Sequence, residues 1–144
     1  MAIFGAGSKW EKNEMKNDFF KNENFVIGWN IKNAQDLYSQ ISTIKIGDII
    51  FLKANKPGNL NLRIKGIGIV KDSFIGVLFD KEENLSLRKK NFELPVKWIV
   101  KSEFKISIPP DTGKLTHVRA GTLHEEYLPY VQKEIIGKIF NQLK

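Results

Sequence analysis

Apolar and polar residues alternate along two neighbouring stretches of the chain, and this pattern predicts a long β-hairpin over residues 45–70. The two arms flank the sequence KPGN, where Pro57 suits the first central position of a type II turn and Gly58 can adopt the positive φ of the second. On the second arm Gly66 and Gly68 share one face. Glycines in a strand mark a bend or a close approach, so they predict either a barrel corner or space for a ligand.

Shorter apolar runs predict further strands, at residues 3–5, 24–29, 73–79 and 93–108. Within the second of these, Phe25, Ile27 and Trp29 share one face because side chains alternate along a strand. Trp29 ends its strand, which raises the question of whether its ring fills the core or forms the wall of a pocket.

Apolar residues at helical spacing predict two helices in the first third of the chain. The first covers residues 10–21, with Ser8 as its N-cap and Glu11 as the capping-box partner. The second follows Asn33, its expected cap, and places Leu37, Tyr38 and Ile41 on one face.

A third helix is predicted over residues 121–143, where Thr122 and Glu125 resemble a capping box and Pro129 starts or kinks the main segment. Its apolar stripe can cover the sheet or a second copy of the chain, so a homodimer is one expectation. Five or six strands with flanking helices predict an α+β fold built around a curved, barrel-like sheet. The length of 144 residues fits a single domain, 1–144.

The composition is that of an ordinary globular protein, with 42% hydrophobic and 27% charged residues. No apolar run approaches the roughly 20 residues of a membrane helix, and the N-terminus lacks the pattern of a secretory signal. The absence of cysteine excludes disulfides, thiol nucleophiles and thiolate metal sites. We therefore expect a cytoplasmic protein without membrane contact.

Positive charge is concentrated in the predicted hairpin. The chain carries 23 Lys and Arg against 16 Asp and Glu, for a net charge of +7. Residues 49–71 contain five basic side chains and no acidic one: Lys53, Lys56, Arg63, Lys65 and Lys71. Any single lysine can simply keep a sheet soluble, whereas the cluster favours contacts with phosphates. Lys53, Lys56, Arg63 and Lys65 are the predicted phosphate contacts.

Sequence motifs of catalysis are missing. There is no GxSxG, Walker-type loop or HExxH, and the two histidines, His117 and His124, have no adjacent carboxylate pattern typical of metal binding. We therefore expect no metal, no cofactor and no catalytic residue. The remaining chemistry is aromatic: Trp98 is predicted to lie in the core between Val96 and Val100, whereas Trp10 and Trp29 are candidates for stacking on a base.

The order of motifs FVIGWN, IKIGDIIFLKA, LRIKGIGIV and FELPVKWIV resembles the PUA-like superfamily, in particular its EVE and YTH branches, over nearly the whole chain. The resemblance implies a pocket beside the barrel that receives a modified nucleobase flipped from its duplex. It extends to the reader domains of modification-dependent restriction systems. By this resemblance Trp29 forms one wall of an aromatic cage, Ser8 and Lys9 contact the base edge, and Phe74 is the one aromatic residue available for the further cage position. Trp10 can substitute for that residue from the other side.

These observations support a non-enzymatic reader of DNA or RNA that carries a modified, methylated base. A small RNA-processing or nucleotide-modifying enzyme is the alternative from another class, with the segment from Arg119 to His124 as its active region. A third alternative is an interaction domain of a defence or mobile-element system.

Overall fold

A computed structural model describes residues 1–28, 32–55, 58–76, 93–110, 119 and 121–143. The strands are β1 (Ile3–Gly7), β2 (Lys9–Trp10), β3 (Asn13–Glu14), β4 (Asn24–Val26), β5 (Ile49–Ala54), β6 (Asn61–Val70), β7 (Glu93–Val100), β8 (Phe104–Ser107) and β9 (Leu123–Glu125). The helices are α1 (Lys16–Asn22), α2 (Gln35–Ile41) and α5 (Pro129–Leu143).

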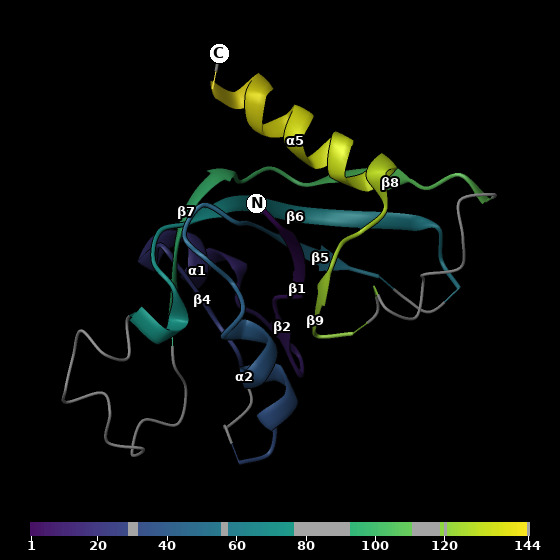
Figure 1. Cartoon of the computed structure of the whole chain (residues 1–144). Coiled ribbons are helices and arrows are strands. Elements are labelled where there is room, and N and C mark those ends of the chain that lie inside the picture. The colour runs from purple at the N-terminus through teal and green to yellow at the C-terminus, as the bar shows by residue number, and fades with distance from the viewer. Residues whose placement is uncertain (29–31, 56–57, 77–92, 111–118, 120, 144) are drawn as a thin grey trace.

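One curled, mixed sheet forms a half-barrel at the centre of the molecule (Figure 1). Its strands follow the order β4-β7-β6-β5-β1-β9, and β8 pairs with the outer part of β6. The pair β1 and β5 is parallel, and the other pairs are antiparallel. The predicted α+β fold with a curved sheet is therefore confirmed, while its assignment to the PUA-like superfamily stays a prediction.

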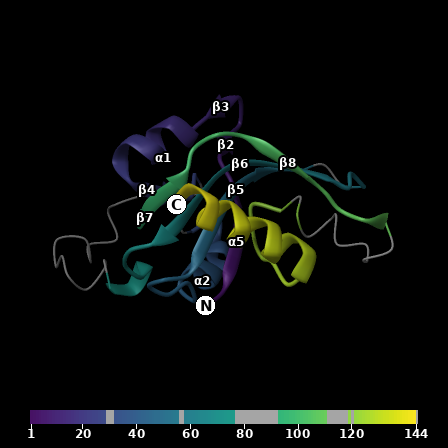
Figure 2. The ribbon, with the colours of Figure 1, turned by 90° about the horizontal axis from the view of Figure 1, so that it is seen from above.

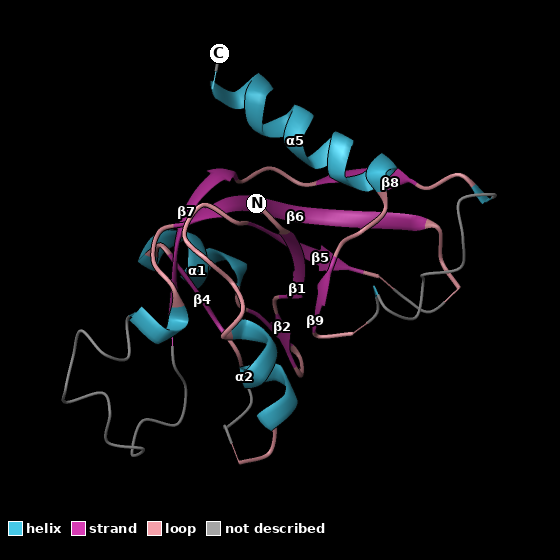
Figure 3. Cartoon of the chain, viewed as in Figure 1, coloured by secondary structure: helices cyan, strands magenta, loops and turns pink. Residues whose placement is uncertain are grey.

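Apolar side chains pack on both faces of the sheet. Helix α5 crosses one face, where Val131, Ile135 and Ile139 join a buried cluster with residues of β5 and β6 (Figures 1 and 2). Helices α1 and α2 lie on the other side and contribute Phe19 and Ile41 to a second cluster (Figure 3). The apolar stripe of α5 thus covers the chain's own sheet.

Several predicted elements differ from the structure. Residues 9–14 form the two-stranded β2–β3 ribbon, so α1 begins only at Lys16, and its N-cap, Met15, makes no side-chain cap bond. The predicted strand 93–108 is divided into β7 and β8. The predicted strand 73–79 is wrong where it is described, since residues 74–76 are helical.

The helix caps expected from sequence are also absent. Helix α2 forms as predicted, but its N-cap is Ala34 and not Asn33. Thr122 and Glu125 cap no helix, because residues 123–125 form β9 and α5 begins at Pro129, the residue predicted to start the main helix.

The IGD sequence at 46–48 forms the turn that leads into β5. Gly47 has a φ of +88°, a conformation that favours glycine. The buried carboxylate of Asp48 accepts hydrogen bonds from the backbone N–H groups of Lys45, at 2.8 Å, and Ala2, at 2.9 Å. This carboxylate therefore joins the start of β1 to the start of β5.

The two glycines of β6 mark close packing and not ligand space. A Cβ on Gly66 would lie 2.6 Å from Cζ of Phe20, and one on Gly68 would overlap Val96 and lie 3.0 Å from the carbonyl oxygen of Lys97. Neither glycine lines the main cavity described below. They leave room for Phe20 of α1 and for Val96 of the neighbouring strand β7.

We predict opposite effects for two Gly→Ala substitutions. Gly68→Ala should lower the free energy of unfolding by about 1 to 3 kcal/mol, because the new methyl group overpacks a buried site. Gly137→Ala, in α5 with no neighbouring atom within 4 Å of the added Cβ, should raise it by about 0.5 to 1 kcal/mol through helix propensity. Urea unfolding of both variants measures the two values. A stable Gly68→Ala protein would contradict the close packing.

Candidate functional site

A cavity of about 420 Å³ opens beside the C-terminal ends of β1 and β5. Its lining comes from the end of β1 and the β2 strand, from β4 and the residues after it, from the end of β5, from the middle of β6, and from the segment before β9. It is lined by Gly7, Ser8, Lys9, Trp10, Glu11, Phe25, Val26, Ile27, Gly28, Lys53, Ala54, Asn55, Lys65, Gly121 and Thr122. The volume lies in the range of small-ligand sites, roughly 300–1,000 Å³.

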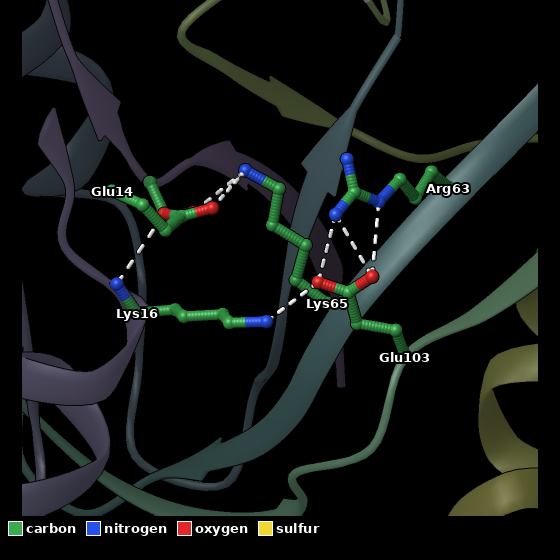
Figure 4. A network of polar contacts seen from close by, with 6 residues as sticks. Glu14, Lys16, Arg63, Lys65 and Glu103 are labelled. Atoms are coloured by element: carbon green, nitrogen blue, oxygen red, sulfur yellow. Dashed lines mark hydrogen bonds and ion pairs between the residues drawn. The ribbon is translucent and has the colours of Figure 1, made fainter. Parts of the chain in front are cut away.

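The lining residue Lys65 is the buried member of an ion pair with the partly exposed Glu14 (Figure 4). The Lys65 ammonium, on β6, pairs with Glu14 of β3 at 2.5 Å and donates to the Ser8 hydroxyl at 3.2 Å. The Ser8 hydroxyl in turn donates to Glu14 at 2.6 Å. Partial burial alone would raise the pKa of Glu14, but the bonds from Lys65 and Ser8 outweigh it, so the pKa lies below its usual value.

A shift in strand register lies at Lys65. Between β5 and β6, Leu52 pairs with Gly66 while the next residue, Lys53, pairs with Ile64, so Lys65 is the extra residue of a β-bulge. Ile64 belongs to the cluster under α5, whereas Lys65 lines the cavity and Gly66 lies against Phe20 of α1. Ile64 and Gly66 therefore lie on opposite faces, although regular alternation would place them on the same one.

Lys53 forms a second buried cation of the same cavity. Its ammonium donates to the carbonyl oxygens of Arg119 and Gly121, which lie next to the segment that leads into β9. Burial lowers the pKa of Lys53 to about 8, although Glu126 favours the charged form. The side chain is therefore still mostly charged at pH 7.

Trp10 contributes an aromatic surface to the cavity. Its half-buried indole packs edge-to-face against Phe19, with ring centroids 6.2 Å apart. The backbone of Gly28 lies against the same indole, since a Cβ there would be 2.8 to 2.9 Å from three ring atoms. The apolar wall is completed by Phe25 and Ile27.

The structure brings together some of the predicted site residues and separates others. Ser8, Lys9, Trp10, Lys53 and Lys65 all line the cavity. Trp29 and Lys56 lie outside the described residues, although Trp29 directly follows the cavity residue Gly28.

Phe74 belongs to the core. It is buried in the cluster beneath the sheet, packs against Tyr38 with ring centroids 5.9 Å apart, and is not among the residues that line the cavity. Trp98 is a core residue as predicted, and its indole N–H donates to the backbone oxygen of Asn24 at 3.1 Å.

The predicted basic hairpin is neutralised by acidic neighbours. Arg63 is engaged by Glu103 at 2.8 Å, and Glu103 also pairs with Lys16 (Figure 4). Lys71 pairs with Glu23 at 3.5 Å. Together with the burial of Lys53 and Lys65, these pairs leave no continuous free positive surface on the described part of the hairpin.

Sequence reasoning missed the contribution of Glu14 and assigned Glu11 to a helix cap. Glu11 and Glu14 are three residues apart, and the predicted helix favoured Glu11 because it lies three residues after Ser8, the spacing of a capping box. The real signal is the turn at Glu11, whose φ is +55° and which reverses the chain between β2 and β3. No sequence rule identifies such a turn at a glutamate.

A second polar cluster lies at the start of α5, beside a hollow of about 590 Å³. The buried Arg119 donates through Nε to Glu126 at 2.9 Å and through Nη2 at 3.2 Å, and Nε2 of His124 lies 3.3 Å from the same carboxylate. Nη1 of Arg119 and Nδ1 of His124 are buried without a hydrogen-bond partner among the described residues. The other alternative residue, His117, lies outside those residues.

Electrostatics fix the charge state of this cluster. Burial alone would raise the pKa of Glu126, but hydrogen bonds from His124 and Arg119 outweigh it and hold the pKa at about 2. Burial lowers the pKa of His124, and its bond to Glu126 offsets only part of this effect. At neutral pH the carboxylate is therefore ionised and the imidazole is neutral.

In the described ranges, no group of three or more His, Asp or Glu side chains is arranged to hold a metal ion, and no helix combines the length and apolar character needed to cross a bilayer.

Compared with known proteins, the sequence matches no family model and has no significant match among curated proteins. Proposals on function therefore depend on the chemistry of the cavity itself.

We predict that acid destabilises the fold in two stages. Because the pKa of His124 is lowered, folding disfavours its protonation, and stability falls as the pH drops below about 6.5. Because the pKa of Glu126 falls from 4.5 to about 2, a further contribution of about 3 kcal/mol is present above pH 4.5 and is lost towards pH 2. Urea unfolding at a series of pH values measures both stages.

Glu126→Gln should remove the contribution of Glu126 to the second stage and also lower stability at pH 7, since it leaves the buried Arg119 without its counterion. Glu134→Gln, at an exposed position of α5, is the matched control and should keep the wild-type profile. Identical acid profiles for both variants would contradict the assigned pKa of Glu126.

Proposed function

We propose that this protein is a non-enzymatic nucleic-acid-binding module whose cavity receives one modified, methylated nucleobase. The observation that carries the proposal is the two-sided character of the cavity. The apolar side chains of Trp10 and Phe25 line the same cavity as the polar side chains of Ser8, Lys53 and Lys65. A planar base with an apolar substituent and a polar edge matches both sets of side chains.

The apolar wall provides the physical basis for preferring a methylated base. An aromatic ring offers a stacking surface worth roughly 1 to 3 kcal/mol per base. A methyl group gains a similar amount in a well-packed apolar site, about 10- to 200-fold in affinity. Trp29, which directly follows Gly28 in sequence, is proposed as a further stacking residue by its resemblance to the YTH pattern.

The cost of this binding mode is the extrusion of the base, which requires a few kcal/mol from a duplex and less from a mismatch or a single strand. Phosphate contacts must offset it. Lys9, exposed at the rim of the cavity, is the described cation best placed for such a contact, and Lys56 stays a candidate. Arg63 can take part only by exchanging Glu103 for a phosphate.

A second candidate function is supported by the convergence of Arg119, His124 and Glu126. A neutral imidazole beside an ionised carboxylate is a combination used in general-base catalysis. However, all three side chains are buried, and Glu126 is occupied by bonds to Arg119 and to the backbone N–H of Leu128. These bonds favour a structural role that anchors the start of α5.

Binding of methylated and plain oligonucleotides tests the reader function. The probes are matched DNA and RNA strands with one central base, in the pairs adenine and N6-methyladenine, cytosine and 5-methylcytosine, and uracil and thymine. We expect the methylated member of one pair to bind about 10- to 200-fold more tightly. Trp10→Ala should weaken that binding by roughly 5- to 150-fold through loss of stacking.

Phe140→Ala is the matched control, because Phe140 is an exposed aromatic residue of α5 outside the cavity. It should leave all affinities unchanged. Equal affinity for the two members of every pair, unaltered in Trp10→Ala and Trp29→Ala, would rule out the reader. Unchanged melting temperatures of the variants exclude misfolding as the cause.

A further inference from the structure

Two buried ammonium groups face the same cavity, and the occupant must satisfy them. Lys53 and Lys65 lie on the paired strands β5 and β6 on either side of the register shift. Their exposed fractions are only 4% and 3%, although both line the cavity. Burying a charge is costly unless it is paired and hydrogen-bonded, so each ammonium needs its full set of partners.

A count of donors shows what is missing. An ammonium has three N–H donors. Lys53 uses two of them on the carbonyl oxygens of Arg119 and Gly121, and Lys65 uses two on Glu14 and Ser8. One N–H of each group thus has no acceptor among the described residues.

The charges around the cavity also favour a ligand that accepts hydrogen bonds. Among the described residues of the lining, Lys9, Lys53 and Lys65 are basic and Glu11 is acidic. Glu14, which lies outside the lining, neutralises Lys65, but the partners of Lys53 are uncharged carbonyl groups. Glu126 favours the charge of Lys53 from a distance, yet its carboxylate is bound to Arg119. The cavity therefore keeps a positive potential that favours a ligand with exposed acceptors.

We infer that the base received by this cavity carries keto oxygens, as guanine, thymine and uracil do, and that Lys65 and Lys53 donate to those oxygens. This inference rests on the proposed function, because it concerns the base that the same cavity holds. It adds the chemical class of the base to the preference for an apolar substituent.

Base chemistry explains the selectivity. Guanine presents O6 and N7 side by side, two acceptors that suit a lysine, and thymine presents O4. Adenine places its N6 amino donor beside N7, so one ammonium would meet another donor. Thymine combines keto oxygens with a methyl group, which can lie on the apolar wall of Phe25 and Ile27.

Fluorescence anisotropy with the full chain tests this inference. The probes are labelled duplexes of one sequence with a single central mismatched site that holds adenine, N6-methyladenine, guanine, uracil, thymine or an abasic residue. We expect the best keto base to bind about 5- to 150-fold more tightly than adenine and N6-methyladenine. Lys65→Met, which keeps the aliphatic stem and removes the ammonium, should abolish this ratio.

Two further variants keep the test informative. Arg63→Met is the matched control: it lies two residues away on the same strand and pairs with Glu103 outside the cavity lining, so it should keep the ratio between bases. If Lys65→Met is unstable because Glu14 loses its partner, the double variant Glu14→Gln/Lys65→Met removes the whole pair and should also lose the ratio.

The outcomes separate this inference from the function on which it rests. A preference for adenine or N6-methyladenine, or a keto preference that survives both Lys65 variants, overturns the inference and leaves the reader function intact. Equal binding of all duplexes, including the abasic one, or no binding at all, overturns the inference, and together with equal binding of the cytosine and 5-methylcytosine strands it overturns the reader function as well. A keto preference that is lost in the Lys65 variants and kept in Arg63→Met supports both.

Discussion

The buried ammonium of Lys65 is the constraint on which the cavity depends. A charge at 3% exposure is tolerated only with close partners, and here these are Glu14 and Ser8. To supply Glu14, the chain after β1 must turn back on itself and form β2 and β3. That reversal carries Trp10 to the cavity, so the ion pair and the aromatic wall are consequences of one local fold.

The opposite side of the cavity is held by a related device. Lys53 binds the carbonyl groups of Arg119 and Gly121, while the side chain of Arg119 is fixed by Glu126. Glu126 also accepts from the backbone N–H of Leu128, and its own carbonyl oxygen accepts from Gln132 of α5. The segment before β9 is therefore tied both to the sheet and to the helix that covers it. Loss of Glu14 or of Glu126 would leave the buried charge of Lys65 or Arg119 without its counterion, and would loosen the part of the cavity lining that this residue holds.

The sequence was sufficient for the regular parts of the fold. Alternation in residues 49–70 predicted β5 and β6, and helical spacing predicted α2 and the part of α5 after Pro129. It failed where tertiary contacts override local preference. Ser8 and Glu11 have the spacing of a capping box, yet Ser8 is bound by a lysine that lies 57 residues further along the chain.

The sequence identified several residues of the candidate site but not the roles of its two buried lysines. Lys53 and Lys65 were predicted as surface cations for phosphates, because lysine is seldom buried. Their burial depends on carboxylate and carbonyl partners distant in sequence, which leave no local pattern. The role predicted for Phe74 was wrong for another reason: the strand predicted over residues 73–79 gave no sign of the helical turn that contains Phe74, which packs against Tyr38.

The distribution of charge determines which part of the molecule can confer specificity. A net charge of +7 by itself favours any polyanion, and such attraction is independent of base sequence. In the described hairpin, however, Arg63 and Lys71 already have acidic partners, so a phosphate would have to displace Glu103 or Glu23 to gain from them. Contacts of that kind contribute little net energy, because one ion pair replaces another. The ammonium groups of Lys53 and Lys65 each keep one N–H donor without an acceptor among the described residues. Only a ligand group that enters the cavity can reach these donors. Discrimination between ligands must therefore arise from what the cavity admits, while the exposed charges serve mainly to bring a polyanion near it.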